Sequence, residues 1–272
     1  MIPLGLLAGN GRFPFLVAQE ARKQGRRVIA IAFNEDADPA LEQVVDRIHW
    51  VFVGQMNKWI QILLSEGVEE VVMAGSVRHS NMYQDLKKFH PDVRALKLFW
   101  KLQDRKADTI LGTVADELAK SGLRLLPSIT YLNHCLAPEG VLTKRKPNAM
   151  ERGDIQFGFK LAKSMAGLDI GQTVCVKNKA VIAVEAMEGT DRCIQRAGEM
   201  AKGDFTVVKV SKPKQDLRFD VPVIGLSTIE NFQEAGGGVL AIEAGKTLIL
   251  DREKLIQWAD SEKISIVGTN DK

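Results

Sequence analysis

Residues 2–33, IPLGLLAGNGRFPFLVAQEARKQGRRVIAIAF, carry the pattern that decides the fold of the first half of the chain. The apolar run Ile2–Ala8 predicts a buried strand, Phe15–Gln24 has the spacing of an amphipathic helix, and Arg27–Phe33 is a second buried run. A strand, a helix and a second strand in this order predict a βαβ unit with parallel strands.

The same alternation of strands and helices continues to residue 126. Further strands are predicted at Ile48–Val53, Glu70–Ala74 and Leu123–Leu126, and further helices at Asn57–Ser65, Asp92–Leu102 and Asp108–Lys120. We therefore expect residues 1–133 to form an α/β domain built on a parallel sheet.

Residues 134–150 interrupt this pattern with two prolines, a glycine and a basic triplet, which is typical of a linker or crossing loop. The elements predicted beyond it are a helix at Ile155–Met165, a hairpin of Thr173–Val176 and Ala180–Ala186, a helix at Asp191–Ala201, a strand at Phe205–Val210, a helix at Thr228–Ala235 and a strand pair of Val239–Ile242 and Thr247–Leu250. Residues 151–272 are therefore expected to form a second domain of mixed α+β type.

Composition excludes several classes of protein. The 272 residues are 45% hydrophobic with a formal net charge of +3, an ordinary globular composition too near neutral to indicate a nucleic-acid partner. Three cysteines without a CxxC pair argue against a disulfide framework or a zinc cluster and fit a reducing compartment. The N-terminus lacks the basic lead of a signal peptide, and no run reaches the roughly 20 apolar residues that span a bilayer.

Two glycine-containing loops follow predicted strands of the first domain. Gly9, Asn10 and Gly11 come directly after the first strand and open a helix, where backbone N–H groups can approach a phosphate. A tight strand-to-helix turn explains the same glycines. Gly75 and Arg78 follow the fourth strand, so both loops are expected at the carboxyl edge of the sheet, where ligands bind.

Two polar stretches of the second half carry the remaining candidate chemistry. Residues 185–191, which include Glu185, Glu188, Gly189, Thr190 and Asp191, lie between a strand and a helix. Either Thr190 or Asp191 caps the helix, or the group holds a phosphate or sugar. The stretch KVSKPKQDLRFDVP, residues 209–222, is the densest group of charges. Its alternation predicts an extended segment with Asp216, Arg218 and Asp220 on one face, suited either to metal binding and water activation or to a surface ion-pair cluster.

Two helical stretches each have a structural explanation as well as a functional one. Asp108 is most simply the N-cap of the helix that follows it, although it could also serve a metal or phosphate site. Residues 87–106 mix basic and apolar side chains, which suits a membrane surface or an acyl-chain channel, or else a core helix with a solvated basic face.

The motifs, taken in order, resemble one known family. They are AGNGRFP (8–14), MAGSVR (73–78), FHPD (89–92), ADTIL (107–111), LDIGQTVCVKN (168–178), AVEAMEGTD (183–191), KPKQDLRFDVPVIG (212–225) and LAIEAGKTLILDRE (240–253). This order resembles the two-domain family of UDP-2,3-diacylglucosamine pyrophosphatases of the lipid A pathway, as distinct from the metallophosphoesterase type. One departure is Ala107, which stands where the family often has the first of two aspartates.

The resemblance implies a Rossmann-like N-terminal domain and hydrolysis of UDP-2,3-diacylglucosamine to lipid X and UMP with Mg²⁺. It implies a cytoplasmic homodimer, and contact with the inner face of the inner membrane is a further expectation. The family's catalytic aspartate corresponds to Asp220 or, less well, to Asp216, with Arg218 beside them, and the two aspartates are the expected metal ligands. Expected substrate contacts are Gly9, Asn10, Gly11, Gly75, Arg78, Gln172, Glu188, Gly189, Thr190, Asp191, Lys209, Lys212 and Gln215.

Two other functions remain open at this point. A nucleotide-sugar oxidoreductase would use the Gly9–Gly11 loop for NAD, but Pro14 replaces the third glycine of the dinucleotide fingerprint. A non-enzymatic nucleotide or lipid sensor would need the charges of residues 209–222 to be purely structural.

Overall fold

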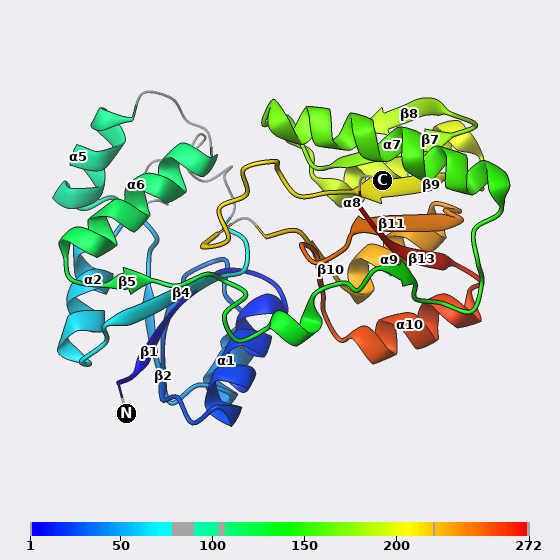
Figure 1. Ribbon diagram of the computed structural model, residues 1–272. Coiled ribbons are helices and arrows are strands. Elements are labelled where there is room, and N and C mark those ends of the chain that lie inside the picture. The colour runs from blue at the N-terminus through cyan, green and yellow to red at the C-terminus, as the bar shows by residue number, and fades with distance from the viewer. Residues whose placement is uncertain (1, 78–89, 103–106, 220, 271–272) are drawn as a thin grey trace. The chain divides into compact units, whose positions relative to one another are not determined.

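The computed structural model describes residues 2–77, 90–102, 107–219 and 221–270 (Figure 1). The chain divides into two compact units. The N-terminal unit comprises residues 1–132 together with 216–220, and the C-terminal unit comprises residues 133–215 together with 221–272. Arg78 and Asp220, two of the predicted site residues, lie outside the described residues.

The N-terminal unit is built on a parallel five-stranded sheet in the order β3-β2-β1-β4-β5. Its strands are β1 (Leu4–Ala8), β2 (Val28–Phe33), β3 (Arg47–Val51), β4 (Glu70–Ala74) and β5 (Arg124–Leu125), and its helices are α1 (Phe13–Lys23), the 3-10 helix η1 (Pro39–Gln43), α2 (Met56–Ser65), α5 (Val93–Lys101) and α6 (Ala107–Lys120). This order is that of the first five strands of a Rossmann sheet, which confirms the predicted α/β class.

Helices cover both faces of this sheet. Buried side chains of α2, α5 and α6, among them Ile60, Ala95 and Leu118, form one core with the strands, and α1 lies on the opposite face (Figure 1). Helix α1 begins two residues earlier than predicted because Pro14 lies in its first turn, where a missing N–H costs nothing. Helix α6 begins at Ala107, so Asp108 lies within the helix and its prediction as the N-cap is wrong.

The C-terminal unit contains a six-stranded sheet in the order β6-β13-β11-β9-β7-β8. Its strands are β6 (Gly140–Val141), β7 (Thr173–Lys177), β8 (Ala180–Val184), β9 (Thr206–Lys209), β11 (Val239–Glu243) and β13 (Ser265–Thr269), and β10 (Val223–Ile224) pairs separately with β12 (Leu248–Ile249). The central strands β9, β11 and β13 are parallel, whereas β6 and β7 run antiparallel to their neighbours. The sheet is therefore mixed, as expected.

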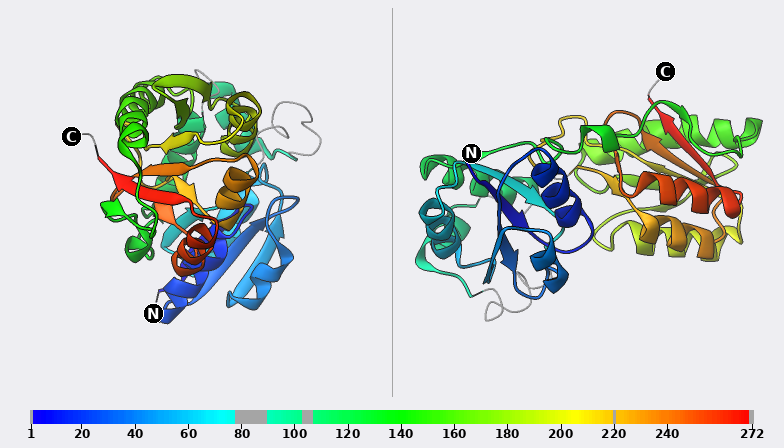
Figure 2. Two further views of the ribbon diagram at one scale, coloured as in Figure 1. Left: turned by 90° about the vertical axis from the view of Figure 1, so that its right-hand side faces the viewer. Right: turned by 90° about the horizontal axis from the view of Figure 1, so that it is seen from below.

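Side chains alternate between the two faces of these strands, so the sheet has a hydrophobic core on each face. The helices are the 3-10 helix η2 (Asn133–Cys135), α7 (Ala149–Gly167), α8 (Thr190–Ala201), α9 (Leu226–Glu234) and α10 (Arg252–Ser261). Val174 and Val208 pack beneath α7, whereas Cys175 and Val207 point to the other face, covered by α8, α9 and α10 (Figures 1 and 2). The unit is therefore a sheet between two helical layers.

Two predictions for this unit differ from the structure. The expected pairing of Val239–Ile242 with Thr247–Leu250 is wrong, because β9 and β13 occupy both edges of β11 and β12 pairs with β10. Residues 134–150, predicted as a linker, include η2, β6 and the start of α7. Among the described residues, no helix is both long enough and apolar enough to cross a membrane.

Candidate active site

The first group of predicted site residues lies where β1 and β4 end side by side. The N–H of Gly9 donates to the carbonyl of Ala74 (2.9 Å), and Asn10 and Ser76 exchange two backbone hydrogen bonds of 2.7 and 3.1 Å. The chain passes from β1 to β2 on one side of the sheet, and β4 lies on the other side. This edge is the topological switch point, where ligands of open α/β sheets bind.

Close packing of these two loops explains their glycines. A Cβ at Gly9 would overlap the carbonyl oxygen of Ser76, and a Cβ at Gly75 would lie 2.6 Å from the carbonyl oxygen of Asn10. Gly11 has open space around it but a φ of +98°, which favours glycine. The tight turn is thus a sufficient reason for these glycines, and phosphate contact stays a prediction.

The second group lies at the carboxyl edge of the C-terminal sheet. Lys209 ends β9, Glu243 ends β11, and Glu185 follows β8, which runs in the same direction. Polar side chains of residues distant in sequence therefore meet at this edge.

A chain of hydrogen bonds connects the predicted residues Lys209 and Thr190. The Lys209 Nζ donates to Thr190 Oγ1 (2.8 Å), and that hydroxyl donates to Glu185 Oε1 (2.8 Å). The backbone N–H of Gln172 donates to Glu185 Oε2 (3.2 Å), so Glu185 joins three predicted residues. Glu185 belongs to the polar stretch 185–191 but is not among the expected substrate contacts.

The loop before α8 differs in part from expectation. Gly189, with φ 83°, is the N-cap of α8 and no side chain caps the helix, so the prediction that Thr190 or Asp191 caps it is wrong. Asp191 lies exposed in the first turn. Glu188 pairs with Arg196 at 2.6 Å, and hydrogen bonds from its own backbone and from Arg196 lower the pKa of this carboxyl.

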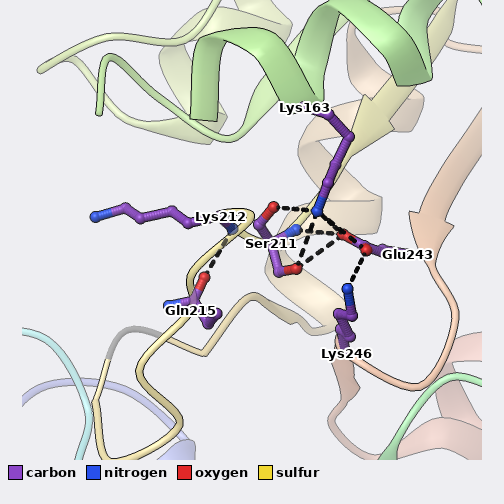
Figure 3. Close-up of polar contacts among 6 residues, drawn as sticks. All are labelled: Lys163, Ser211, Lys212, Gln215, Glu243 and Lys246. Carbon is purple, nitrogen blue, oxygen red and sulfur yellow. Dashed lines mark hydrogen bonds and ion pairs between the residues drawn. The ribbon is translucent and has the colours of Figure 1, made fainter. Parts of the chain in front are cut away.

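A buried carboxylate cluster, formed by Lys163, Ser211, Glu243 and Lys246, lies beside this network (Figure 3). Glu243 Oε2 accepts from both the N–H and the hydroxyl of Ser211, each at 2.8 Å. Lys163 Nζ approaches both carboxylate oxygens at 3.0 and 3.1 Å, and Lys246 Nζ approaches Oε1 at 2.8 Å. Sequence analysis missed this cluster. The available signal in the sequence was a glutamate, Glu243, at the end of an apolar strand.

The charge of Glu243 makes stability depend on acid pH. Burial raises the pKa of Glu243, but hydrogen bonds from Lys246, Ser211 and Lys163 outweigh burial and hold the pKa below its usual 4.5. A lowered folded-state pKa stabilises the fold above pH 4.5, and this contribution is lost as the pH falls through the lowered value. Urea unfolding of the wild type and of Glu243→Gln is therefore expected to differ most above pH 4.5 and to converge below it. A difference in the free energy of unfolding that stays constant across this pH range contradicts the assignment of a lowered pKa to Glu243.

The segment that follows the cluster, residues 212–219, is a series of turns. The N–H of Lys212 donates to Gln215 Oε1 (2.8 Å), and Lys212 Nζ pairs with Asp169 at 2.6 Å. The N–H of Arg218 donates to Asp216 Oδ1 (3.0 Å), which folds the chain into an Asx turn. The expectation of an extended, alternating segment is therefore wrong for the described residues.

Asp216 and Arg218 nevertheless come together. The guanidinium donates to both carboxylate oxygens at 2.7 to 3.1 Å, and this pairing lowers the pKa of Asp216. In the N-terminal unit, the N–H of Ser128 donates to the Leu217 carbonyl (2.7 Å) and its hydroxyl approaches the Arg218 carbonyl (2.7 Å). Ser128 thus fixes this turn, a role that sequence analysis did not predict.

The described residues do not build a self-contained metal site. Among residues 2–77, 90–102, 107–219 and 221–270, no three His, Cys, Asp or Glu side chains are grouped as metal ligands. Both oxygens of Asp216 accept hydrogen bonds from Arg218. Mg²⁺ prefers oxygen ligands and commonly takes only one or two carboxylates besides the oxygens of a phosphate substrate.

Comparison with known proteins gives the family. Models described as the LpxI N-terminal domain and the LpxI C-terminal domain match residues 3–135 and 138–267. The chain is 32% identical over 281 aligned positions to UDP-2,3-diacylglucosamine pyrophosphatase LpxI of Caulobacter vibrioides, covering 99% of this chain and 98% of that protein.

Similarity to solved structures is slight. A UDP-glucose-4-epimerase from Stenotrophomonas maltophila with bound NAD and formylated UDP-arabinopyranose is 11% identical with a TM-score of 0.29, over 45% of this chain and 35% of that chain. The Bordetella bronchiseptica enzyme WbmG in complex with NAD and UDP is 16% identical with a TM-score of 0.29, over 44% and 34%. Neither supports an inference about function. The two family models and the full-length relative confirm the resemblance predicted from the motifs, and the chain belongs to the LpxI family.

Proposed function

We propose that the protein hydrolyses the pyrophosphate bond of UDP-2,3-diacylglucosamine, releasing UMP and lipid X in lipid A biosynthesis. The observation that carries this proposal is the match to the UDP-2,3-diacylglucosamine pyrophosphatase of Caulobacter vibrioides along the entire chain. The test is to incubate the purified protein with this substrate and follow the release of UMP. Cofactor uptake in an NAD titration without UMP release would favour the oxidoreductase instead.

The proposed reaction is attack of water on the β-phosphorus, on the sugar side. A bond forms between the water oxygen and the β-phosphorus, the bond from the β-phosphorus to the bridging oxygen breaks, and UMP leaves with that oxygen. The proton lost by water is accepted by a carboxylate, for which the family resemblance favours Asp220. Lysine and arginine side chains stabilise the charge that develops on the phosphoryl oxygens.

Lys209 is best suited to that electrostatic role. Its ammonium donates to the neutral hydroxyl of Thr190, whereas Lys212 contacts Asp169 and Arg218 contacts Asp216. A hydroxyl orients the lysine without cancelling its charge. Asp216, kept ionised by Arg218, positions that guanidinium.

We also propose that Mg²⁺ is needed, bound mainly by the pyrophosphate oxygens and supported by Asp216 and Asp220. Mg²⁺ would neutralise phosphate charge. Removing divalent ions with EDTA is expected to abolish UMP release, and adding Mg²⁺ back is expected to restore it. Full activity in EDTA contradicts the requirement.

The family resemblance further supports a cytoplasmic homodimer. Sedimentation equilibrium of the purified protein is expected to give twice the chain mass of 30.1 kDa. A monomer at micromolar concentration contradicts this assembly.

Helix α5 is proposed to contact an anionic lipid surface. Val93, Leu96 and Trp100 recur at helical spacing and are 67%, 41% and 86% exposed, beside the exposed Lys97. Such a combination favours binding in the interface of a bilayer, and a diacyl substrate supplies the reason. Replacing Val93 and Trp100 with serine is expected to reduce co-sedimentation with phosphatidylglycerol vesicles severalfold. Replacing the exposed Leu64 of α2 is the matched control. Equal loss in both variants contradicts the assignment to α5.

A further inference from the structure

Glu243 is a buried charge for which the proposed reaction has no direct use. Its side chain is 4% exposed, while its partners Lys163 and Lys246 are 21% and 49% exposed. Removing a carboxylate from water is costly, so even where the hydrogen bonds of its partners outweigh that cost, the net gain in stability is small. Stability is therefore a weak reason for this charge, so what the carboxylate holds in place matters.

Glu243 and Lys163 together fix Ser211, the second residue after β9. Glu243 accepts from the N–H and the hydroxyl of Ser211, and Lys163 donates to its carbonyl oxygen at 2.8 Å. Both backbone polar groups and the side chain of Ser211 are thus held by two side chains, one from α7 and one from β11 (Figure 3). Ser211 is itself completely buried.

Ser211 lies at the root of the charged segment. Two residues before it is Lys209, which contacts Thr190, and directly after it is Lys212, whose side chain points away from Glu243 (Figure 3). The N–H of Lys212 donates to the side chain of Gln215, so the turn that leads to Asp216 begins at a fixed point. A rotation at Ser211 would move Lys212 and this turn relative to Lys209, which is held in the sheet.

We propose that Glu243, supported by Lys163, is a positioning residue that fixes the segment Lys209–Gln215 for hydrolysis. This inference rests on the proposed function, because positioning has a kinetic consequence only if the segment acts on the pyrophosphate. Neither Glu243 nor Lys163 needs to touch the substrate. Catalytic groups must be held within a fraction of an ångström by a second layer of residues, and a displacement of 1 Å is enough to lower turnover about 10²-fold.

The test compares Glu243→Gln with Lys246→Met. Glutamine keeps the size of Glu243 but its amide cannot accept all these hydrogen bonds, so the hold on Ser211 weakens. We expect kcat to fall about 10- to 100-fold with KM within a few-fold of wild type. Lys246, whose side chain is 49% exposed, contacts Glu243 and makes no hydrogen bond to Ser211 in the described part of the chain, so Lys246→Met is expected to keep kcat within about twofold.

Hydrogen exchange gives a readout that does not depend on activity. Amides of residues 210–215 are expected to exchange faster in Glu243→Gln than in the wild type, with β7 and β13 unchanged. Ser211→Ala, which keeps the N–H bond, is a milder second variant expected to change exchange and kcat in the same direction. The proposal is overturned if the amides of this segment exchange in Glu243→Gln at the wild-type rate. It is also overturned if Glu243→Gln is less stable than the wild type but its folded enzyme keeps the wild-type kcat. A wild-type protein that releases no UMP defeats the proposed function instead, and exchange still decides whether Glu243 holds the segment.

Discussion

Asp220→Ala is expected to lower the kcat of UMP release by about 10²- to 10⁴-fold, the usual effect of removing a general acid–base group. The reason is that the proposed reaction must transfer a proton from the attacking water, and the family resemblance assigns the essential carboxylate to this segment. The variant is expected to remain folded by circular dichroism and to bind UDP-2,3-diacylglucosamine in a calorimetric titration.

Asp216 provides the comparison within the same segment. Asp216→Ala leaves the Arg218 guanidinium without its carboxylate, whereas Asp216→Asn keeps an acceptor for the N–H of Arg218. We expect the alanine variant to lose turnover and the asparagine variant to retain more of it. Wild-type turnover from both Asp216→Ala and Asp220→Ala contradicts the assignment of the reaction to this segment.

Gly9→Ala is expected to lower the free energy of unfolding of the N-terminal unit by about 1–3 kcal/mol, as overpacking does elsewhere. The added Cβ would overlap the Ser76 carbonyl oxygen, which is backbone and has no alternative rotamer. The two loops would have to separate, and their mutual hydrogen bonds would lengthen. Because these loops lie at the switch point of the sheet, UMP binding is expected to weaken as well.

Gly112→Ala is the matched control for that substitution. Gly112 lies within α6, and no described atom outside the backbone of its own helix lies within 4 Å of an added Cβ, so alanine is expected to raise stability by up to about 1 kcal/mol. Urea unfolding of the three proteins gives the comparison. Equal or higher stability of Gly9→Ala relative to wild type contradicts the packing account of this glycine.

The N-terminal sheet could be predicted closely because its information is local. A strand such as Leu4–Ala8 is a short apolar run, and the helices α1, α2, α5 and α6 show their apolar spacing in the sequence. Parallel strands joined by helices leave few alternative topologies. The glycines at positions 9 and 75 were found for the same reason, since both follow strands.

The C-terminal unit was predicted less well because its pairings are not local. Val239–Glu243 and Leu248–Ile249 are neighbours in sequence, yet each pairs with strands that are more distant in the sequence. Arg252–Ser261 and Ser265–Thr269 follow the last predicted element and were not anticipated.

The carboxylate cluster was not predicted for the same reason, because its contacts are not local in sequence. Lys163, Ser211 and Glu243 are separated by 48 and 32 residues, and only the sheet brings them together. Spacing rules detect ligands that share an element, so they detect neither this cluster nor the contact of Ser128 with Arg218.

Hydrolysis in water enriched with ¹⁸O tests the central claim most directly. The wild-type protein, given UDP-2,3-diacylglucosamine and Mg²⁺, is predicted to release unlabelled UMP and lipid X with one ¹⁸O atom in its phosphate, as mass spectrometry of both products would detect. Label in UMP would contradict attack at the β-phosphorus. Absence of both products would contradict the proposed function itself.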